Sequence, residues 1–290
     1  MKKNSEQGDA QWDEQVPLRV MSFNIRLDTP HDGLHAWPYR KDRVFSLLRF
    51  HRPDIIGLQE VRGAQLADLE ASLSGFAWLG VGRDDGREAG EFAAIFYRLE
   101  RLELLDQGNF WLSKTPDVPG SINWKACCIR IVTWAKFLDR LTGQVFFLFN
   151  THFDQASKKA RRKSASLLLE RLPAIAADAP LIVTGDLNCG EHSKPYHILT
   201  QGPFADGGHL QDAKVQSLTP HYGPTATFHA FTGILRSRID YIFVVNGIRV
   251  LQHATLTDHW GGRYPSDHYP VIADMVVNQM VGCPGGHYGS

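Results

Sequence analysis

The feature that most constrains this chain is an apolar run that ends in a glycine, an acid and an amide: residues 181–188, Leu-Ile-Val-Thr-Gly-Asp-Leu-Asn. A short run of β-branched and apolar residues bounded by glycine is typical of a buried strand. Asp186 and Asn188 then lie where the strand meets its loop, and their spacing of two lets both side chains face one pocket. Ligands of α/β folds bind outside strand ends. The pair suits a hard cation or a water that attacks phosphate, and an ordinary Asx turn explains it equally well.

Length and composition are those of a globular protein with one or two domains. The chain has 290 residues, of which 43% are hydrophobic and 21% charged. Because 31 basic residues balance 31 acidic ones, the formal net charge is zero. This argues against a protein that grips long nucleic acid through its overall field, but it leaves a local basic patch open. Four cysteines without zinc-finger spacing are expected to be free thiols: Cys127, Cys128, Cys189 and Cys283.

The two ends of the chain are expected to be flexible. Residues 1–16 are polar and form an N-terminal arm, residues 17–278 form a single domain, and the Gly-rich residues 279–290 form a tail. We find neither the apolar segment of a signal peptide nor a run long enough to cross a membrane. A cytoplasmic monomer without a membrane partner is therefore the default expectation.

Hydrophobic patterning predicts more strands than helices. Helical periodicity predicts helices at 38–50, 63–74, 156–178 and 193–200. Strands are predicted at 18–25, 54–60, 77–82, 92–98, 128–138, 144–151, 181–188, 238–245, 248–256 and 270–277. Residues 201–227 are predicted to be a loop. Without a linker or an internal repeat, the pattern predicts one α/β domain in which two sheets pack face to face with helices outside.

Polar residues recur at six of these strand ends. They are Asn24, Glu60, His152, Asp186 with Asn188, Asp240, and Asp267 with His268. Turn chemistry explains one such end more readily than six. If the sheets bring the ends together, four carboxylates share one pocket and repel each other unless a cation neutralises them. Oxygen ligands favour Mg²⁺, with Mn²⁺ as a substitute, over zinc.

The six motifs that carry these residues resemble, in their order, the endonuclease/exonuclease/phosphatase superfamily with its DNase I-like fold. They are Met-Ser-Phe-Asn at 21–24, Gly-Leu-Gln-Glu at 57–60, Asn-Thr-His-Phe-Asp at 150–154, Gly-Asp-Leu-Asn at 185–188, Arg-Ile-Asp-Tyr-Ile at 238–242 and Ser-Asp-His at 266–268. The resemblance covers residues 18–277 and implies a four-layer α/β sandwich with two mixed sheets flanked by helices. Residues 82–91 and 227–231 are similar to the bacterial branch nearest the deadenylase and nocturnin-like proteins.

The resemblance also implies a role for each acid and amide near the metal. Glu60 would bind the cation, with Asn24 in or beside the same shell. Asp186 would orient or deprotonate the attacking water, and Asn188 would help hold the phosphate.

The two histidines would act on the phosphoryl group. His268 would contact or protonate its oxygens, with Asp267 as the orienting acid or as a metal ligand. Asp240 would support this histidine network, and His152 would bond a phosphate oxygen. Where AP endonucleases carry an acid two residues after the first asparagine, this chain has Arg26, which argues against a two-metal arrangement and abasic-site activity.

The expected function is a divalent-metal-dependent hydrolase that cleaves phosphodiesters or phosphomonoesters by in-line attack of an activated water. A small phosphorylated molecule or a short single-stranded nucleic acid is the expected substrate. Arg83 and Arg130 would contact its phosphates, and Phe228 and Trp124 would stack on a base or sugar. The basic run 158–163 is either a solvated helix face or a phosphate contact. The alternatives are a nuclease of longer DNA or RNA and a catalytically silent binding protein on the same fold.

Overall fold

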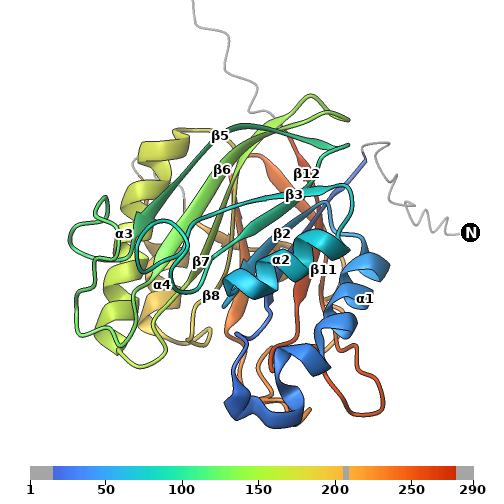
Figure 1. Cartoon of the computed structure of the whole chain (residues 1–290). Coiled ribbons are helices and arrows are strands. Elements are labelled where there is room, and N and C mark those ends of the chain that lie inside the picture. The colour runs from blue at the N-terminus through green and yellow to red at the C-terminus, as the bar shows by residue number, and fades with distance from the viewer. Residues whose placement is uncertain (1–15, 205–208, 279–290) are drawn as a thin grey trace, which may run out of the picture.

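The computed structural model describes residues 16–204 and 209–278, and in it two six-stranded sheets pack face to face with helices outside (Figure 1). The predicted four-layer α/β sandwich is therefore confirmed. The predicted arm, apart from Val16, and the predicted tail lie outside the described residues, and so does Cys283. Within the described part of the chain, no helix is long and apolar enough to span a membrane.

The first sheet has the strand order β11-β12-β1-β2-β4-β3. Its strands are β1 Leu18–Asn24, β2 Ile55–Gln59, β3 Phe76–Leu79, β4 Ile95–Arg98, β11 Ile248–Thr255 and β12 Val271–Val277. Its outer face is covered by α1 Lys41–His51 and α2 Gly63–Ser72. Short 3₁₀ turns at Pro30–His35 and Trp37–Tyr39 precede α1. The predicted helix at 38–50 thus begins three residues late, because Pro38 lies in a separate turn.

The second sheet has the order β5-β6-β7-β8-β10-β9. Its strands are β5 Leu102–Trp111, β6 Ile131–Asp139, β7 Val145–His152, β8 Leu181–Asp186, β9 Gln211–Asp212 and β10 Asp240–Val245. Its outer face packs against α3 Lys158–Ala176 and α4 Lys194–Gln201, which Figure 1 shows beside this sheet. A one-turn helix, α5 Ala213–Gln216, follows β9.

Three features of the second sheet differ from the sequence predictions. β5 was not predicted, because this edge strand carries polar residues and a bulge between Leu104 and Asp106 rather than a regular alternation. β6 begins at Ile131 and not at residue 128. The predicted helix at 156–178 is α3, which continues through Pro173 to Ala176. The predicted loop 201–227 includes β9 and α5.

The interface between the sheets is apolar at one end and polar near the strand ends that carry the motifs. Phe137, Phe146 and Ile182 pack against Val20 and Ile55 in the apolar part.

In the polar part, one buried amide bonds the two sheets together. Asn150 Nδ2 of β7 donates to the carbonyl oxygens of Leu58 and Ala94, at 2.8 and 3.0 Å. Its Oδ1 accepts from Gln59 Nε2 at 2.7 Å. Gly57 leaves the space for this contact, since a Cβ there would lie 2.1 Å from Thr184 Oγ1.

Candidate active site

The ends of five strands, two from the first sheet and three from the second, bring the predicted residues together. β1 and β2 are parallel, so Asn24 is level with the residue that precedes Glu60. β7 and β8 are parallel, so His152 is level with Asp186, and antiparallel β10 places Asp240 opposite Asp186. Because the two sheets face each other, these polar ends form one cluster.

The Asn24 side chain links the two sheets inside this cluster. Its Nδ2 donates to Glu60 Oε1 and to Asp186 Oδ2, both at 3.0 Å, and the residue is fully buried. Glu60 has a left-handed φ of 61°, a strained conformation for a residue with a Cβ. Its Oε2 accepts from the Leu27 N–H at 3.0 Å. Burial opposes ionisation, but the hydrogen bonds from Leu27 and Asn24 outweigh it and lower the pKa of Glu60. Glu60 is therefore an anion at neutral pH.

Asp186 uses its two carboxylate oxygens differently. Oδ1 accepts from the Asn188 N–H at 2.8 Å, which is the Asx turn that the sequence also allowed. Oδ2 faces Asn24 and lies 3.4 Å from His152 Nε2. Asn188 Nδ2 lies 2.8 Å from the same His152 nitrogen and donates to the Phe153 carbonyl at 3.0 Å. The turn thus positions the acid, and the acid still faces the cluster.

His268 is oriented by Asp240 and not by its neighbour Asp267. Its Nδ1 lies 2.9 Å from Asp240 Oδ2, and its Nε2 lies 3.9 Å from Asp186 Oδ2. Of the two roles expected for Asp267, that of orienting the imidazole is taken by Asp240, which was expected to support the histidine, because adjacent side chains diverge whereas β10 delivers Asp240 to the ring. The Thr227 hydroxyl oxygen accepts from the Asp240 N–H at 3.2 Å and thereby fixes the start of β10.

Charge and burial give the central groups different protonation states. Burial opposes protonation of His268, but the charge and hydrogen bond of Asp240 outweigh it and raise the pKa of His268 well above its usual value. Burial, followed by the Asp240 charge, raises the pKa of Asp186 to about 7. Burial and the positive charge of Arg130 hold the pKa of His152 well below its usual value. The site therefore combines an imidazolium, a neutral imidazole and an acid that titrates near neutrality.

The carboxylates of the cluster fit a divalent cation. Ligand atoms of Asp186, Asp240 and His268 lie within 4.8 Å of one another. The buried Asp240 Oδ1 has no hydrogen-bond partner among the described residues. A protonated imidazole cannot ligate a metal, however, so the ionised Glu60 is a better ligand than His268. Oxygen donors of this kind suit Mg²⁺ or Mn²⁺.

Two arginines, Arg83 and Arg130, also line the site. Arg83 Nη1 lies 2.6 Å from Glu91 Oε2, and Arg130 Nη1 lies 3.9 Å from the same oxygen. Arg130 also donates to Gln155. Its Nε and Nη1, and the Nε of Arg83, are buried without a hydrogen-bond partner in the described part of the chain. Two guanidinium groups thus share one carboxylate, and three of their nitrogens are left without a hydrogen-bond partner among the described residues.

These residues surround one cavity of about 240 Å³. Its lining comprises Arg26, Leu27, Glu60, Arg83, Glu91, Cys128, Arg130, His152, Gln155, Asp186, Asn188, Phe228, Ile239, Asp267 and His268. Asn24 and Asp240 lie directly behind it through their bonds to Asp186 and His268.

Two predicted aromatic contacts have different outcomes. The Phe228 ring lines the cavity, with its centroid 5.0 Å from that of His268. Trp124 is not among the described residues that line it, and its carbonyl instead accepts from the Ser157 hydroxyl at the start of α3. Glu91 and Gln155 were missed, since a loop acid and a loop amide carry no pattern of their own. Arg26 was noted only as a departure from a motif, yet its Nη1 lies 3.7 Å from Glu60 Oε2.

The cysteine environments also differ from expectation. The three described cysteines are free, as predicted. Cys127 and Cys128 are not buried in a strand but lie in a loop, with Cys127 exposed and Cys128 on the cavity. Cys189 is buried, with 8% of its surface exposed.

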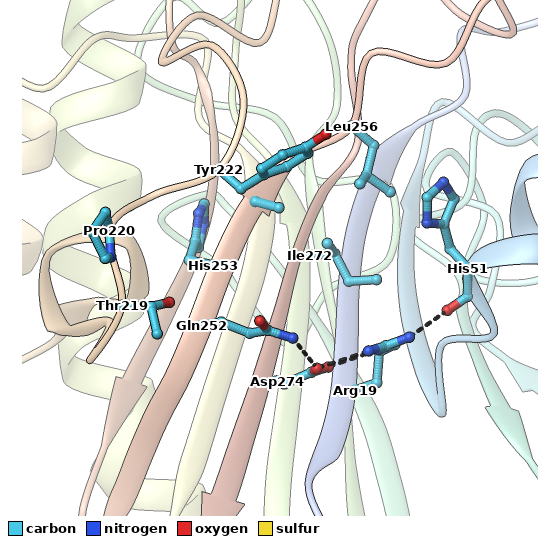
Figure 2. Close-up of a pocket in the computed structure, with 11 residues that line it drawn as sticks. Arg19, His51, Thr219, Pro220, Tyr222, Gln252, His253, Leu256, Ile272 and Asp274 are labelled. Atoms are coloured by element: carbon cyan, nitrogen blue, oxygen red, sulfur yellow. Dashed lines mark hydrogen bonds and ion pairs between the residues drawn. The ribbon is translucent and has the colours of Figure 1, made fainter. Parts of the chain in front are cut away.

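A larger cavity of about 400 Å³ lies on the outer face of the first sheet (Figure 2). Its charged groups already bond to each other. Arg19 Nε lies 2.7 Å from Asp274 Oδ1, Gln252 Nε2 donates to Asp274 Oδ2 at 2.6 Å, and Arg19 Nη1 donates to the His51 carbonyl at 3.1 Å. It holds none of the motif residues, so size alone does not identify the site of chemistry.

Similar solved structures share both the fold and much of the sequence. An endonuclease/exonuclease/phosphatase from Bacteroides vulgatus is 40% identical over 91% of this chain and 100% of that chain, with a TM-score of 0.85. A mannosyl-6-phosphatase from Bacteroides thetaiotaomicron is 36% identical over 89% and 99% of the two chains, with a TM-score of 0.83. The human nocturnin catalytic domain, at 22% identity over 90% and 95% of the two chains and a TM-score of 0.68, shares the fold.

Sequence relatives agree with the expected deadenylase-like branch. The CCR4-Not complex 3′-5′-exoribonuclease subunit of Aspergillus oryzae is 26% identical over 91% of this chain, which spans 48% of that protein's length. The sequence pattern of the Endonuclease/Exonuclease/phosphatase family matches residues 21–268. The chain belongs to this family and is one of its phosphoesterases.

Proposed function

We propose that the protein is a divalent-metal-dependent hydrolase of a small phosphorylated molecule or a short single-stranded nucleic acid. One observation carries the proposal: a single cavity of about 240 Å³ is lined both by ionised and titrating acids, Glu60 and Asp186, and by two incompletely bonded arginines, Arg83 and Arg130. A phosphate ester suits this lining, since the acids serve a cation and a water, and the arginines serve the phosphoryl oxygens.

The roles follow from the protonation states. Asp186, with a pKa of about 7, suits a general base that accepts a proton from the attacking water. Asn188 and the neutral His152 adjoin Asp186 and would hold a phosphoryl oxygen. His268, charged through Asp240, would donate a hydrogen bond to the developing negative charge or a proton to the leaving oxygen. Asp267 would contribute further negative charge near Glu60.

A divalent cation would be held by Glu60, with Asn24 beside it and Asp267 within the same acidic group. When bound, it supplies Lewis-acid neutralisation of phosphate charge. The preference for Mg²⁺, with Mn²⁺ as a substitute, rests on the oxygen-only ligand set.

The substrate class is supported by the size of the site and by the relatives. The Bacteroides thetaiotaomicron relative is named a mannosyl-6-phosphatase, and the Aspergillus oryzae relative a 3′-5′-exoribonuclease subunit. Both names describe the cleavage of phosphate esters, and a single phosphate group can enter a cavity of this size. The balanced charge of the whole chain disfavours long duplex DNA.

The test is a panel of hexose 6-phosphate, nucleoside monophosphates, short single-stranded RNA and DNA, and plasmid DNA at about 0.15 M salt. Each is assayed with Mg²⁺, with Mn²⁺ and after exhaustive EDTA treatment. We expect turnover of the smaller compounds that EDTA abolishes and either metal restores. Full activity after chelation, or restoration by Zn²⁺ alone, would refute the metal assignment. Efficient plasmid nicking without turnover of any smaller compound would refute the substrate class.

A further inference from the structure

A second, strongly basic hollow lies beside the catalytic cavity, where the N-terminal ends of α3 and α4 meet. Its volume is about 370 Å³. It is lined by Lys158, Arg161, Arg162, Cys189, Ser193, Lys194 and Pro195. We refer to these seven residues as the basic hollow.

The basic hollow and the catalytic cavity share a wall. Cys189 of the hollow directly follows Asn188 of the cavity. Arg161 Nη1 donates to the carbonyl oxygens of Asp154 and Gln155, at 2.6 and 2.9 Å. The Gln155 side chain in turn accepts from Arg130 inside the catalytic cavity. The hollow therefore adjoins the catalytic cavity.

The positive charge of the hollow is not balanced by protein groups. Four of its seven lining residues are cationic and none is acidic. In the described part of the chain, none of these four side chains forms an ion pair, whereas Arg238 and Arg101 elsewhere each contact two acids. Arg161 is only 9% exposed, so its charge is poorly screened by solvent.

The two helices add to this positive field. Lys158 and Lys194 are the first residues of α3 and α4, and neither helix has an acid in its first turn. Ser157 and Ser193 cap the helices through the Ala160 and Tyr196 N–H groups. Helix N-termini carry partial positive charge, so cations there are unfavourable and anions favourable. The arrangement stabilises the protein only poorly unless an anion occupies the hollow.

We infer that the basic hollow binds a second phosphate group of the substrate while the phosphate to be cleaved lies in the catalytic cavity. The inference rests on the proposed function and narrows its substrate class to compounds with at least two phosphate groups. A sugar bisphosphate and a short single-stranded oligonucleotide both have this chemistry. An arginine fork, two lysines and two helix ends suit the multiple oxygens of a phosphate better than a single carboxylate.

The kinetic test compares two double variants that remove the same charge. Lys158→Gln with Lys194→Gln removes two cations from the hollow. Lys159→Gln with Lys163→Gln removes two exposed cations of α3 that do not line it. For each protein, kcat/KM is measured on hexose 1,6-bisphosphate against hexose 6-phosphate, and on a thymidine trinucleotide against thymidine monophosphate. For each pair, we divide kcat/KM for the compound with two phosphates by kcat/KM for the compound with one. We expect this ratio to fall about 10-fold or more in the hollow variant, the scale of one missing charge-assisted hydrogen bond. In the control variant the ratio should be unchanged.

A binding measurement needs no metal and no turnover. In EDTA, the affinity of a fluorescein-labelled single-stranded trinucleotide is measured by anisotropy against salt concentration. In the hollow variant, the magnitude of the slope of log affinity against log salt should fall by about 0.7 for each phosphate that is no longer neutralised. In the control variant this slope should be the same as in the parent protein.

The outcomes separate this inference from the proposed function. A lower ratio only for the bisphosphate, or only for the trinucleotide, identifies which source supplies the second phosphate. Hydrolysis with equal ratios in all three proteins would overturn the inference and leave the proposed function intact. Absence of hydrolysis with every compound and metal would refute the proposed function, and the anisotropy slopes would still decide whether the hollow binds phosphate. Equal salt-dependence slopes in the hollow variant and the control variant would overturn the inference that the hollow binds phosphate.

Discussion

Replacing Gly57 by alanine is expected to destabilise the protein by forcing the two sheets apart. Gly57 lies in β2 and faces the second sheet. An added Cβ would lie 2.1 Å from Thr184 Oγ1, 2.6 Å from Asn150 Oδ1 and 2.9 Å from Asn150 Cγ. Real Cβ atoms do not approach other atoms this closely, so the neighbours must move.

The neighbours cannot move without breaking hydrogen bonds. Asn150 holds Gln59 and two backbone carbonyls of the first sheet, and Thr184 Oγ1 lies 3.1 Å from Asn150 Oδ1. Overpacking costs about 1–3 kcal/mol, and one buried polar group left unbonded costs about 1–3 kcal/mol more. The preference of a strand for alanine over glycine returns only about 0.5–1 kcal/mol. The free energy of unfolding should therefore fall by roughly 1–5 kcal/mol.

Gly63→Ala is the matched control. Gly63 begins α2, and a Cβ there would meet nothing within 4 Å. This change should leave stability unaltered or raise it by up to about 1 kcal/mol. Both variants are compared with the parent protein by urea unfolding followed by circular dichroism. If Gly57→Ala unfolds at the parent midpoint with the same m-value, the sheets accommodate a methyl group at no energetic cost, and the reasoning is refuted.

Three further predictions concern the catalytic groups, the pH dependence of stability and the buried thiol. Asp186→Asn and His268→Ala should each lower the hydrolysis rate by roughly 10²-fold or more at unchanged unfolding midpoints; near-parental turnover would remove either residue from the mechanism. Burial lowers the pKa of His253 from 6.5 to about 3, so between these values the unfolded chain binds a proton that the folded chain does not, and stability falls as pH falls. Relative to His253→Gln, the parent should lose about 1.4 kcal/mol per pH unit below pH 6.5, as read from urea unfolding at pH 7, 6 and 5; parallel pH profiles would contradict this. Cys189→Ser should retain most activity, because burial raises the pKa of this thiol; mass spectrometry that traps a covalent intermediate on Cys189 would disprove the water mechanism.

The sequence predicted the second sheet's part of the site well where apolar strands ran directly into polar residues. Asp186 was identified because a glycine and an acid ended a buried strand, and Asp240 because it is a polar residue at the end of an apolar strand, where a charge needs a partner. Both inferences depend only on local pattern and on the energetic penalty of burying charge.

Pairing between distant segments was harder to predict. That Asp240 rather than Asp267 orients His268 depends on β8 and β10 being neighbours, and no local pattern encodes that register. Trp124 is not among the described residues that line the cavity, and no local pattern in its irregular loop signals this. The edge strand β5 was missed because it has one strand neighbour, β6, and little need for regular alternation.

Because Asn24 bonds to both Glu60 and Asp186, the geometry of the site depends on how the two sheets are positioned relative to each other. The proposed metal ligand belongs to one sheet and the proposed base to the other, with a single amide 3.0 Å from each. A displacement of about 1 Å between catalytic groups can lower a rate 10²-fold. The same displacement would leave the secondary structure, as measured by circular dichroism, almost unchanged. Under mild heat or low urea, the enzyme should therefore become inactive while both sheets are still folded.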